Sequence, residues 1–270
     1  MTLPQRQSHI VTQRTGPEDP ILEETLKEAL KQVSSEDVIA IADELAERHV
    51  RLFAGLQVGS DQWASSFADV AAAVTHTKAN ARTITNYFAQ GDYTSFRELL
   101  GGHAPTPMRV SSFVEKLNAL DTRLALELAS GLLHNISPNT NWLWTRWLWD
   151  PTTGTGILPL LAGSTHNLLA DNLADGYVRV GAVTAMSMKF AAGTGLWTDP
   201  LVSNEKRAPF ANSAFLACAY NIYLYGTTSW RLSREFNNLL PSLPNMARKL
   251  LGLKKVMDER ADTETNESNS

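Results

Sequence analysis

The sequence contains one cysteine, Cys218, among its 270 residues. One thiol cannot form a disulfide within the chain, and it is too few for a zinc site built from cysteines. A disulfide scaffold and a structural zinc cluster are therefore excluded. Cys218 lies inside the apolar run 210–225, where a thiol normally packs as a small hydrophobic group.

Uninterrupted apolar runs long enough to cross a membrane are also missing. A spanning helix needs about 20 mostly apolar residues. The best candidate, residues 210–226, is shorter and carries Asn212, Ser213 and Asn221. Residues 1–20 have no apolar core of the kind found in signal peptides. We therefore expect a soluble, cytoplasmic protein without a transmembrane segment, in which 210–226 forms a buried helix.

Strand signals are scarce, because only residues 177–180 have mild β character. Helical periodicity recurs through most of the chain, and 43% of the residues are hydrophobic, which is enough for a sizeable core. The pattern predicts an all-α fold, a single multi-helix globular domain of about ten to twelve helices over residues 19–256. Residues 1–18 are predicted to form a flexible arm, and residues 257–270 a disordered acidic tail.

Capping signals place several helix ends. Ser35 precedes two acidic residues and is predicted to cap a helix that follows it. Asp121 is predicted to cap a helix over 122–133 in the same way. Gly193 is predicted to end a helix over 178–192, since glycine commonly follows the last helical residue.

Charge is distributed unevenly along the chain. Residues 18–50 hold ten acidic side chains against three basic ones, whereas residues 227–256 hold six basic side chains against one acidic. Two interpretations stay open: the two regions neutralise each other in the fold, or each faces a partner. Between them, residues 134–226 carry few charges and five of the seven tryptophans, which predicts a buried, Trp-rich central region.

The strongest local feature is the Trp-rich segment 141–150, which we predict to be a helix started by Ser137-Pro138. Helical spacing would place Trp142, Arg146 and Trp149 on one face, with Asp150 four residues after Arg146 and able to pair with it. One interpretation is a packed aromatic core with one internally paired arginine. The other is an aromatic-lined pocket in which Arg146 binds an anionic ligand.

The second feature is the segment 164–175, in which Ser164 or Thr165 is predicted to cap a helix that runs to Ala174. Asn167, Asp171 and Asp175 have the spacing i, i+4, i+8 and would form one polar stripe that begins beside His166. Such a stripe could bind a metal or exchange protons. It lacks the histidine spacing of helical metal sites, so a solvated polar face is the favoured interpretation, and no metal site is assigned.

The third feature is the basic, leucine-containing region near the C-terminus. Its predicted basic surface consists of Arg231, Arg234, Arg248, Lys249, Lys254 and Lys255. These side chains could meet a nucleic acid, an acidic partner or a membrane surface. Alternatively, the leucines dock on the core and the charges are solvated.

Three functional hypotheses follow. The first is a noncatalytic helical protein that binds a protein partner, a second copy of itself, or an apolar or anionic small ligand. The second is a helical enzyme with a pocket between Arg146 and the predicted helix His166–Asp175. The third is a nucleic-acid-binding protein, which the net charge of −4 disfavours. Because no nucleophile or phosphate-loop motif is present, no catalytic residue or cofactor is assigned, and the first hypothesis leads.

Overall fold

The computed structural model describes residues 30, 33–57, 63–74, 78–89, 93–162, 166–229 and 242–253. These residues contain eleven helices and no strand, apart from one isolated bridge between Asp150 and Thr155. The predicted all-α fold is confirmed, as is the predicted range of helix number. The predicted arm 1–18 and the predicted tail 257–270 lie outside the described residues.

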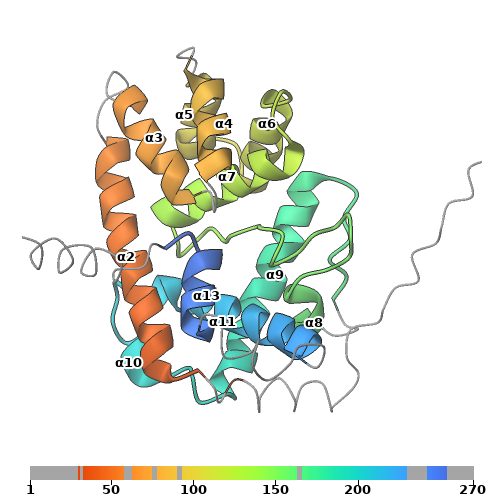
Figure 1. The fold of residues 1–270 in the computed structure, drawn as a ribbon. Helices are drawn as coiled ribbons and strands as arrows, with labels where there is room; N and C mark the ends of the chain where they lie inside the picture. The colour runs from red at the N-terminus through yellow and green to blue at the C-terminus, as the bar shows by residue number, and fades with distance from the viewer. Residues whose placement is uncertain are drawn as a thin grey trace, which may run out of the picture.

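The helices form two tiers joined by the long helix α2 (Figure 1). The upper tier contains α3 (Trp63–Val74), α4 (Lys78–Phe88), α5 (Thr94–Gly101), α6 (Thr106–Lys116) and α7 (Thr122–Ile136). The lower tier contains α8 (Leu158–Ala162), α9 (Leu173–Ala192), α10 (Asp199–Val202), α11 (Ala208–Ser229) and α13 (Leu243–Leu250). Helix α2 (Ser35–Gln57) runs along one side of both tiers.

Side-chain caps set the starts of α2 and α7. Before α2, the Ser34 hydroxyl accepts from the Asp37 N–H at 3.1 Å, and the Asp37 carboxylate accepts from the Ser34 N–H at 3.2 Å. This reciprocal pair is a capping box, so the cap lies one residue before the predicted Ser35. Before α7, Asp121 accepts from two backbone N–H groups, which confirms the predicted cap.

Helix α11 forms the centre of the lower tier, where it packs against α2, α9 and α13. Nearly every residue from Phe210 to Ile222 is buried, so the predicted buried helix is confirmed. Cys218 is fully buried within it, and burial raises the pKa of the thiol to about 12. This cysteine is therefore an unreactive packing group.

The Trp-rich segment 141–149 is not a helix, which corrects the prediction. Its backbone is irregular, and its end pairs with a later stretch: the N–H groups of Ile157 and Leu158 donate to the carbonyls of Trp147 and Leu148, both at 3.0 Å. A helix would have spread the indoles around one axis. The irregular backbone instead directs the ring of Trp147 toward α11 and the ring of Trp142 toward α9.

Burial of this segment follows the prediction even though its conformation does not. Trp144, Trp147 and Trp149 are each 4–5% exposed, and Trp142 is partly buried against the core. This segment is therefore a Trp-rich part of the core, whereas other stretches of the predicted central region, such as 151–155 and 169–172, are exposed.

The predicted helix over 164–174 is also wrong, since residues 166–172 are irregular and α9 begins only at Leu173. Two asparagines set this boundary. The Asn167 side chain accepts from the N–H of Leu169 at 2.8 Å, which makes a local turn. The Asn172 side chain caps α9 by accepting from the Asp175 N–H at 2.9 Å. The end of α9 before Gly193 agrees with the prediction.

Candidate functional site

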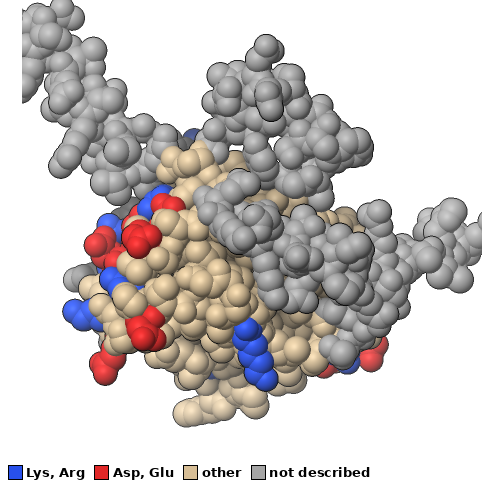
Figure 2. Space-filling view, turned by 90° about the horizontal axis from the view of Figure 1, so that it is seen from below, with Lys and Arg blue, Asp and Glu red and all other residues tan. Residues whose placement is uncertain are grey.

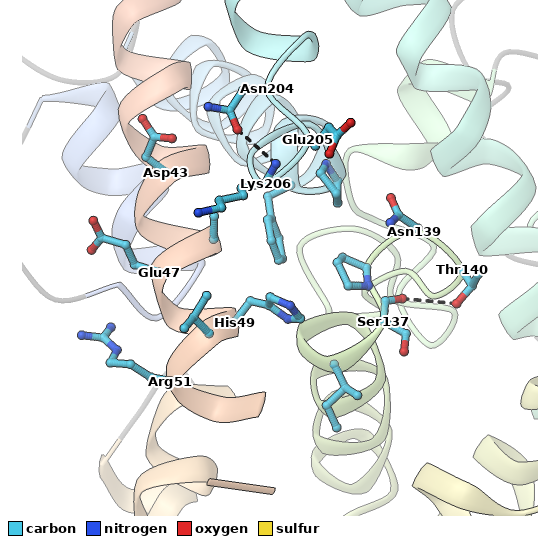
Figure 3. Close-up of a pocket in the computed structure, with 16 residues that line it drawn as sticks. Asp43, Glu47, His49, Arg51, Ser137, Asn139, Thr140, Asn204, Glu205 and Lys206 are labelled. Carbon is cyan, nitrogen blue, oxygen red and sulfur yellow. Dashed lines mark hydrogen bonds between the residues drawn. The ribbon is translucent and has the colours of Figure 1, made fainter. Parts of the chain in front are cut away.

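A groove of about 1170 Å³ opens between three parts of the chain that lie far apart in the sequence (Figure 3). One wall is the face of α2 between Asp43 and Arg51. The second is the end of α7 with the turn 137–140, and the third is the loop 204–206 with the first turn of α11. The groove is thus formed by tertiary packing and not by any local motif.

A bidentate ion pair fixes the third wall to the first. The Nε and Nη2 atoms of Arg207 donate to the two carboxylate oxygens of Asp43, both at 2.7 Å, and Nη1 donates to the Pro200 carbonyl at 2.8 Å. Two parallel hydrogen bonds of this kind fix the relative orientation of the guanidinium and carboxylate groups as well as the distance between them. The hydrogen bond to Asp43 raises the pKa of Arg207, which therefore stays charged.

His49 projects into the groove from α2 (Figure 3). Its Nδ1 atom forms a hydrogen bond with the carbonyl oxygen of Asn135. A carbonyl oxygen only accepts, so Nδ1 carries the proton in the neutral ring and Nε2 is left as a hydrogen-bond acceptor. The ring centroid lies 5.7 Å from that of Phe210 and 5.8 Å from that of Phe53.

The rest of the lining combines apolar surface with charges of both signs. Val50 on α2, which is 61% exposed, and the buried Phe210 on α11 both line the groove. Around them stand two acidic and two basic side chains with exposed positions: Glu47, Glu205, Arg51 and Lys206. The groove therefore offers an apolar area, hydrogen-bonding groups and a rim without a dominant charge.

Behind Phe210 lies a buried pair formed by His134 and Ser213. The Nδ1 atom of His134 is 2.8 Å from the Asn141 carbonyl, and its Nε2 atom is 3.0 Å from the Ser213 hydroxyl. Nδ1 is therefore the donor to the carbonyl, and Nε2 accepts from the serine. Burial lowers the pKa of His134 to about 4, so the ring is neutral at neutral pH.

A serine bonded to a histidine is also the arrangement that activates a nucleophile. Here both residues are buried, with exposed fractions of 3% for His134 and 7% for Ser213. The Phe210 ring lies edge-on against His134 at 5.7 Å. Because a substrate carbonyl has no access to the serine oxygen, we interpret the pair as structural.

Arg48 is a second buried polar group beside the groove. Its Nε donates to the side-chain oxygen of Asn135 at 3.1 Å, and its Nη1 donates to the carbonyls of Ala73, at 3.1 Å, and Leu251. These carbonyls belong to the C-terminal ends of α3 and α13, which carry partial negative charge. Burial, together with Arg51, lowers the pKa of Arg48 to about 10, so it remains charged at neutral pH.

The first set of sequence-predicted site residues is dispersed in the fold. Arg146 pairs with Asp150 at 3.3 Å, as the spacing indicated, but its side chain is 62% exposed. Trp142 instead stacks on Tyr177, with ring centroids 4.9 Å apart. The Nε1 atom of Trp149 is buried and has no hydrogen-bond partner. The predicted shared face of Trp142, Arg146 and Trp149 does not form, because the segment is not helical.

The second set does not form the predicted stripe. Asp175 pairs with Arg179 at 2.8 Å, and Arg179 also donates to the Asn167 carbonyl at 3.2 Å. His166 and Asp171 are exposed. Among the described residues, no group of three or more His, Cys, Asp or Glu side chains is arranged to hold a metal ion.

Of the predicted basic surface, only Arg248 and Lys249 lie within the described residues. Arg248 pairs with Glu44 at 2.7 Å, whereas Lys249 is exposed. The other four, Arg231, Arg234, Lys254 and Lys255, lie outside the described residues. At Glu44 and Arg248 the acidic and basic parts of the chain neutralise each other. On the face seen in Figure 2, acidic and basic side chains are intermingled at one side.

Sequence reasoning missed His49 and Arg48. Arg48 had a detectable signal, because it continues the spacing of Val38, Ile41 and Leu45 on the apolar face of α2. A charged residue at a core position points to a buried polar partner. His49 gave no such signal, since its hydrogen-bond partner Asn135 lies on α7 and its ring neighbour Phe210 lies on α11.

Comparison with known proteins gave no match to any protein family, curated protein or solved structure. The described helices include none that is long and apolar enough to cross a membrane.

Proposed function

We propose that this protein binds a segment of a partner protein, in extended conformation and without catalysis, in the groove between α2, the end of α7 and the start of α11. The observation that carries the proposal is the combination of the size of the groove with its mixed lining. The cytoplasm is the location that we propose with it, since the one cysteine is a buried free thiol that needs no oxidising compartment.

The size favours a peptide over a small molecule. Pockets for small ligands usually have volumes of about 300–1000 Å³ and enclose most of the ligand. This groove, at about 1170 Å³, exceeds that range. Its lining comes from three separate segments of the chain, as suits an extended segment that contacts several elements at once.

The lining matches the needs of an extended chain. Backbone amides of a bound segment require both donors and acceptors, which His49, Asn139 and Asn204 supply. The exposed side chain of Val50 offers a contact for one apolar side chain of the bound segment. Because the rim carries charges of both signs, it favours peptides with a matching pattern of charges and does not attract every peptide of one net charge.

Two alternative functions have less support. An enzyme would need an accessible reactive group, whereas the serine bonded to His134 is buried. A nucleic-acid-binding protein would need basic side chains available for phosphates, whereas Arg248 is engaged by Glu44.

Selection of a random peptide library displayed on phage, against the full-length protein, tests the proposal. We expect related sequences to be enriched, and a synthetic peptide of that sequence to bind the native protein. Val50→Glu should weaken this binding at least about tenfold, because a carboxylate would replace the apolar contact. Met108→Glu is the matched control, since Met108 is 56% exposed on α6, away from the groove.

The two possible failures are clear. If no sequence is enriched, the groove is not a peptide site. If Val50→Glu and Met108→Glu bind the selected peptide equally well, the peptide binds elsewhere, and the proposal is wrong.

A further inference from the structure

Helix α9 is apolar around most of its circumference. Its only charged residues are Asp175, Arg179 and Lys189, and none lies between Val180 and Met188. Helices with apolar residues on all sides are normally enclosed by other structure. We therefore expect α9 to be enclosed on all sides, by this chain or by a partner.

Three neighbouring helices cover only part of α9. Contacts with α6, α8 and α11 bury Tyr177, Val180 and Val183 (Figure 1). The remaining face is exposed: Val178 is 48% exposed and Met188 41%, which places them among the few large hydrophobic side chains exposed in the described part of the chain.

The exposed residues form a continuous strip. Val178, Ala182 and Ala185 are separated by four and then three residues, which is the spacing of one helix face, and all three are exposed. The same face continues to Asp175 at one end and to the exposed Lys189 at the other. Alanines at its centre allow another helix to approach to about 8 Å between axes, the close end of the usual range.

The charges at the two ends make the strip complementary to itself. Asp175 pairs with Arg179 of its own helix through one carboxylate oxygen, Oδ2, and its side chain remains 36% exposed, so its other oxygen can accept from a lysine of a second copy. Asp175 lies seven residues before Ala182, and Lys189 lies seven residues after it. If two copies of the strip pack antiparallel about a two-fold axis at Ala182, Asp175 of each copy faces Lys189 of the other. A two-fold interface requires this kind of self-complementarity.

We propose that the exposed face of α9 packs against the same face of a second copy of this chain, antiparallel, with the two-fold axis at Ala182. The composition of the face disfavours a membrane surface, because interfacial helices carry several basic residues, whereas Lys189 is the one basic residue on this strip. The proposal does not depend on peptide binding in the groove.

Sedimentation of the full-length protein across a dilution series tests the proposal. We expect a reversible dimer whose dissociation constant rises about a hundredfold in Ala182→Glu, because two carboxylates would then meet at the axis. Ala182 is exposed, so this change leaves the core of the subunit intact. The control Val50→Glu, in the groove, should dimerise like the native protein.

Cysteine cross-linking tests the register. Ala182→Cys should form a disulfide-linked dimer on mild oxidation, because position 182 meets itself at the axis. Ala192→Cys, near the end of α9, should not, since the two copies of that position would lie far apart. Cys218 is buried and does not interfere. A monomer at every concentration, or a dimer that is unaffected by Ala182→Glu and not linked through position 182, would overturn the proposal.

Discussion

The indole nitrogen of Trp142 donates a hydrogen bond of 2.7 Å to the carbonyl oxygen of Tyr177. The two rings are also stacked, with an interplanar angle of 23°. Trp142 is thereby held against α9 by two interactions, and its ring lies directly over Gly181, where a Cβ atom would overlap the indole. Glycine at position 181 is required by the close approach of this ring.

We therefore expect Gly181→Ala to lower the free energy of unfolding by about 1–2 kcal/mol. The added methyl group displaces the indole, and such overpacking destabilises the fold by about 1–3 kcal/mol. The higher helix propensity of alanine offsets at most about 1 kcal/mol of this loss. Urea unfolding followed by circular dichroism measures the change. Gly101→Ala is the control, because a Cβ there meets nothing within 4 Å. Equal stability of the two variants would show that Trp142 does not pack as described.

The same contact shows how far the sequence could predict the fold. Low charge and high tryptophan content correctly indicated that 141–149 is buried, because burial depends mainly on composition. The helical conformation was wrong, because it is decided by distant partners such as Tyr177 on α9, which local periodicity does not contain. Helices with clear local caps, such as α7 with Asp121, were predicted well because their signals are local.

The start of α9 gives a second prediction that separates the structure from the sequence-based expectation. Asn172 caps the helix, so Asn172→Ala should lower the free energy of unfolding by about 1 kcal/mol. If residues 164–174 were helical, alanine at this interior position would be neutral or stabilising. Thermal or urea unfolding measures the change, with Asn118→Ala, at an exposed asparagine in the turn after α6, as the control.

Arg48 carries the third prediction. Arg48→Met keeps much of the side-chain volume but removes the donors to Asn135, Ala73 and Leu251. Because buried acceptors left without a partner each cost about 1–3 kcal/mol, we expect a loss of at least about 3 kcal/mol in the free energy of unfolding. Arg51→Met, at the exposed neighbouring residue, should change it by less than about 0.5 kcal/mol. Similar losses in both variants would contradict the assigned role of Arg48.

The candidate groove could not have been predicted from the sequence, for a related reason. Its walls come from residues 43–51, 136–140 and 204–210, which meet only through packing and through the Asp43–Arg207 pair. Neither the spacing nor the composition of any one of these segments marks a site. The first two sequence-predicted sites depended on helices over 141–150 and 164–174 that do not form, so their polar residues lie in separate local interactions.

His134 carries the last prediction, which concerns pH. Burial lowers its pKa to about 4, helped by the nearby charges of Arg48 and His49, although the hydrogen bond to Asn141 acts in the opposite direction. In the unfolded chain the ordinary value is 6.5. Between these two values the unfolded chain binds a proton that the folded protein excludes. The free energy of unfolding therefore falls as the pH decreases from 6.5 toward 4, and this contribution of the neutral ring is fully present above 6.5.

The difference between the pKa of 6.5 in the unfolded chain and the pKa of about 4 in the folded protein corresponds to about 3 kcal/mol in the free energy of unfolding, at about 1.4 kcal/mol per pKa unit. His134→Gln removes the titration, so the stability difference between the native protein and this variant isolates His134 from other groups that titrate in the same range. We expect this difference, measured by urea unfolding, to shrink by about 2–3 kcal/mol from about pH 7.5 to about pH 4.5. If both proteins lose stability in parallel, His134 takes up a proton in the folded state at its ordinary pKa, and its burial with Ser213 is not as described.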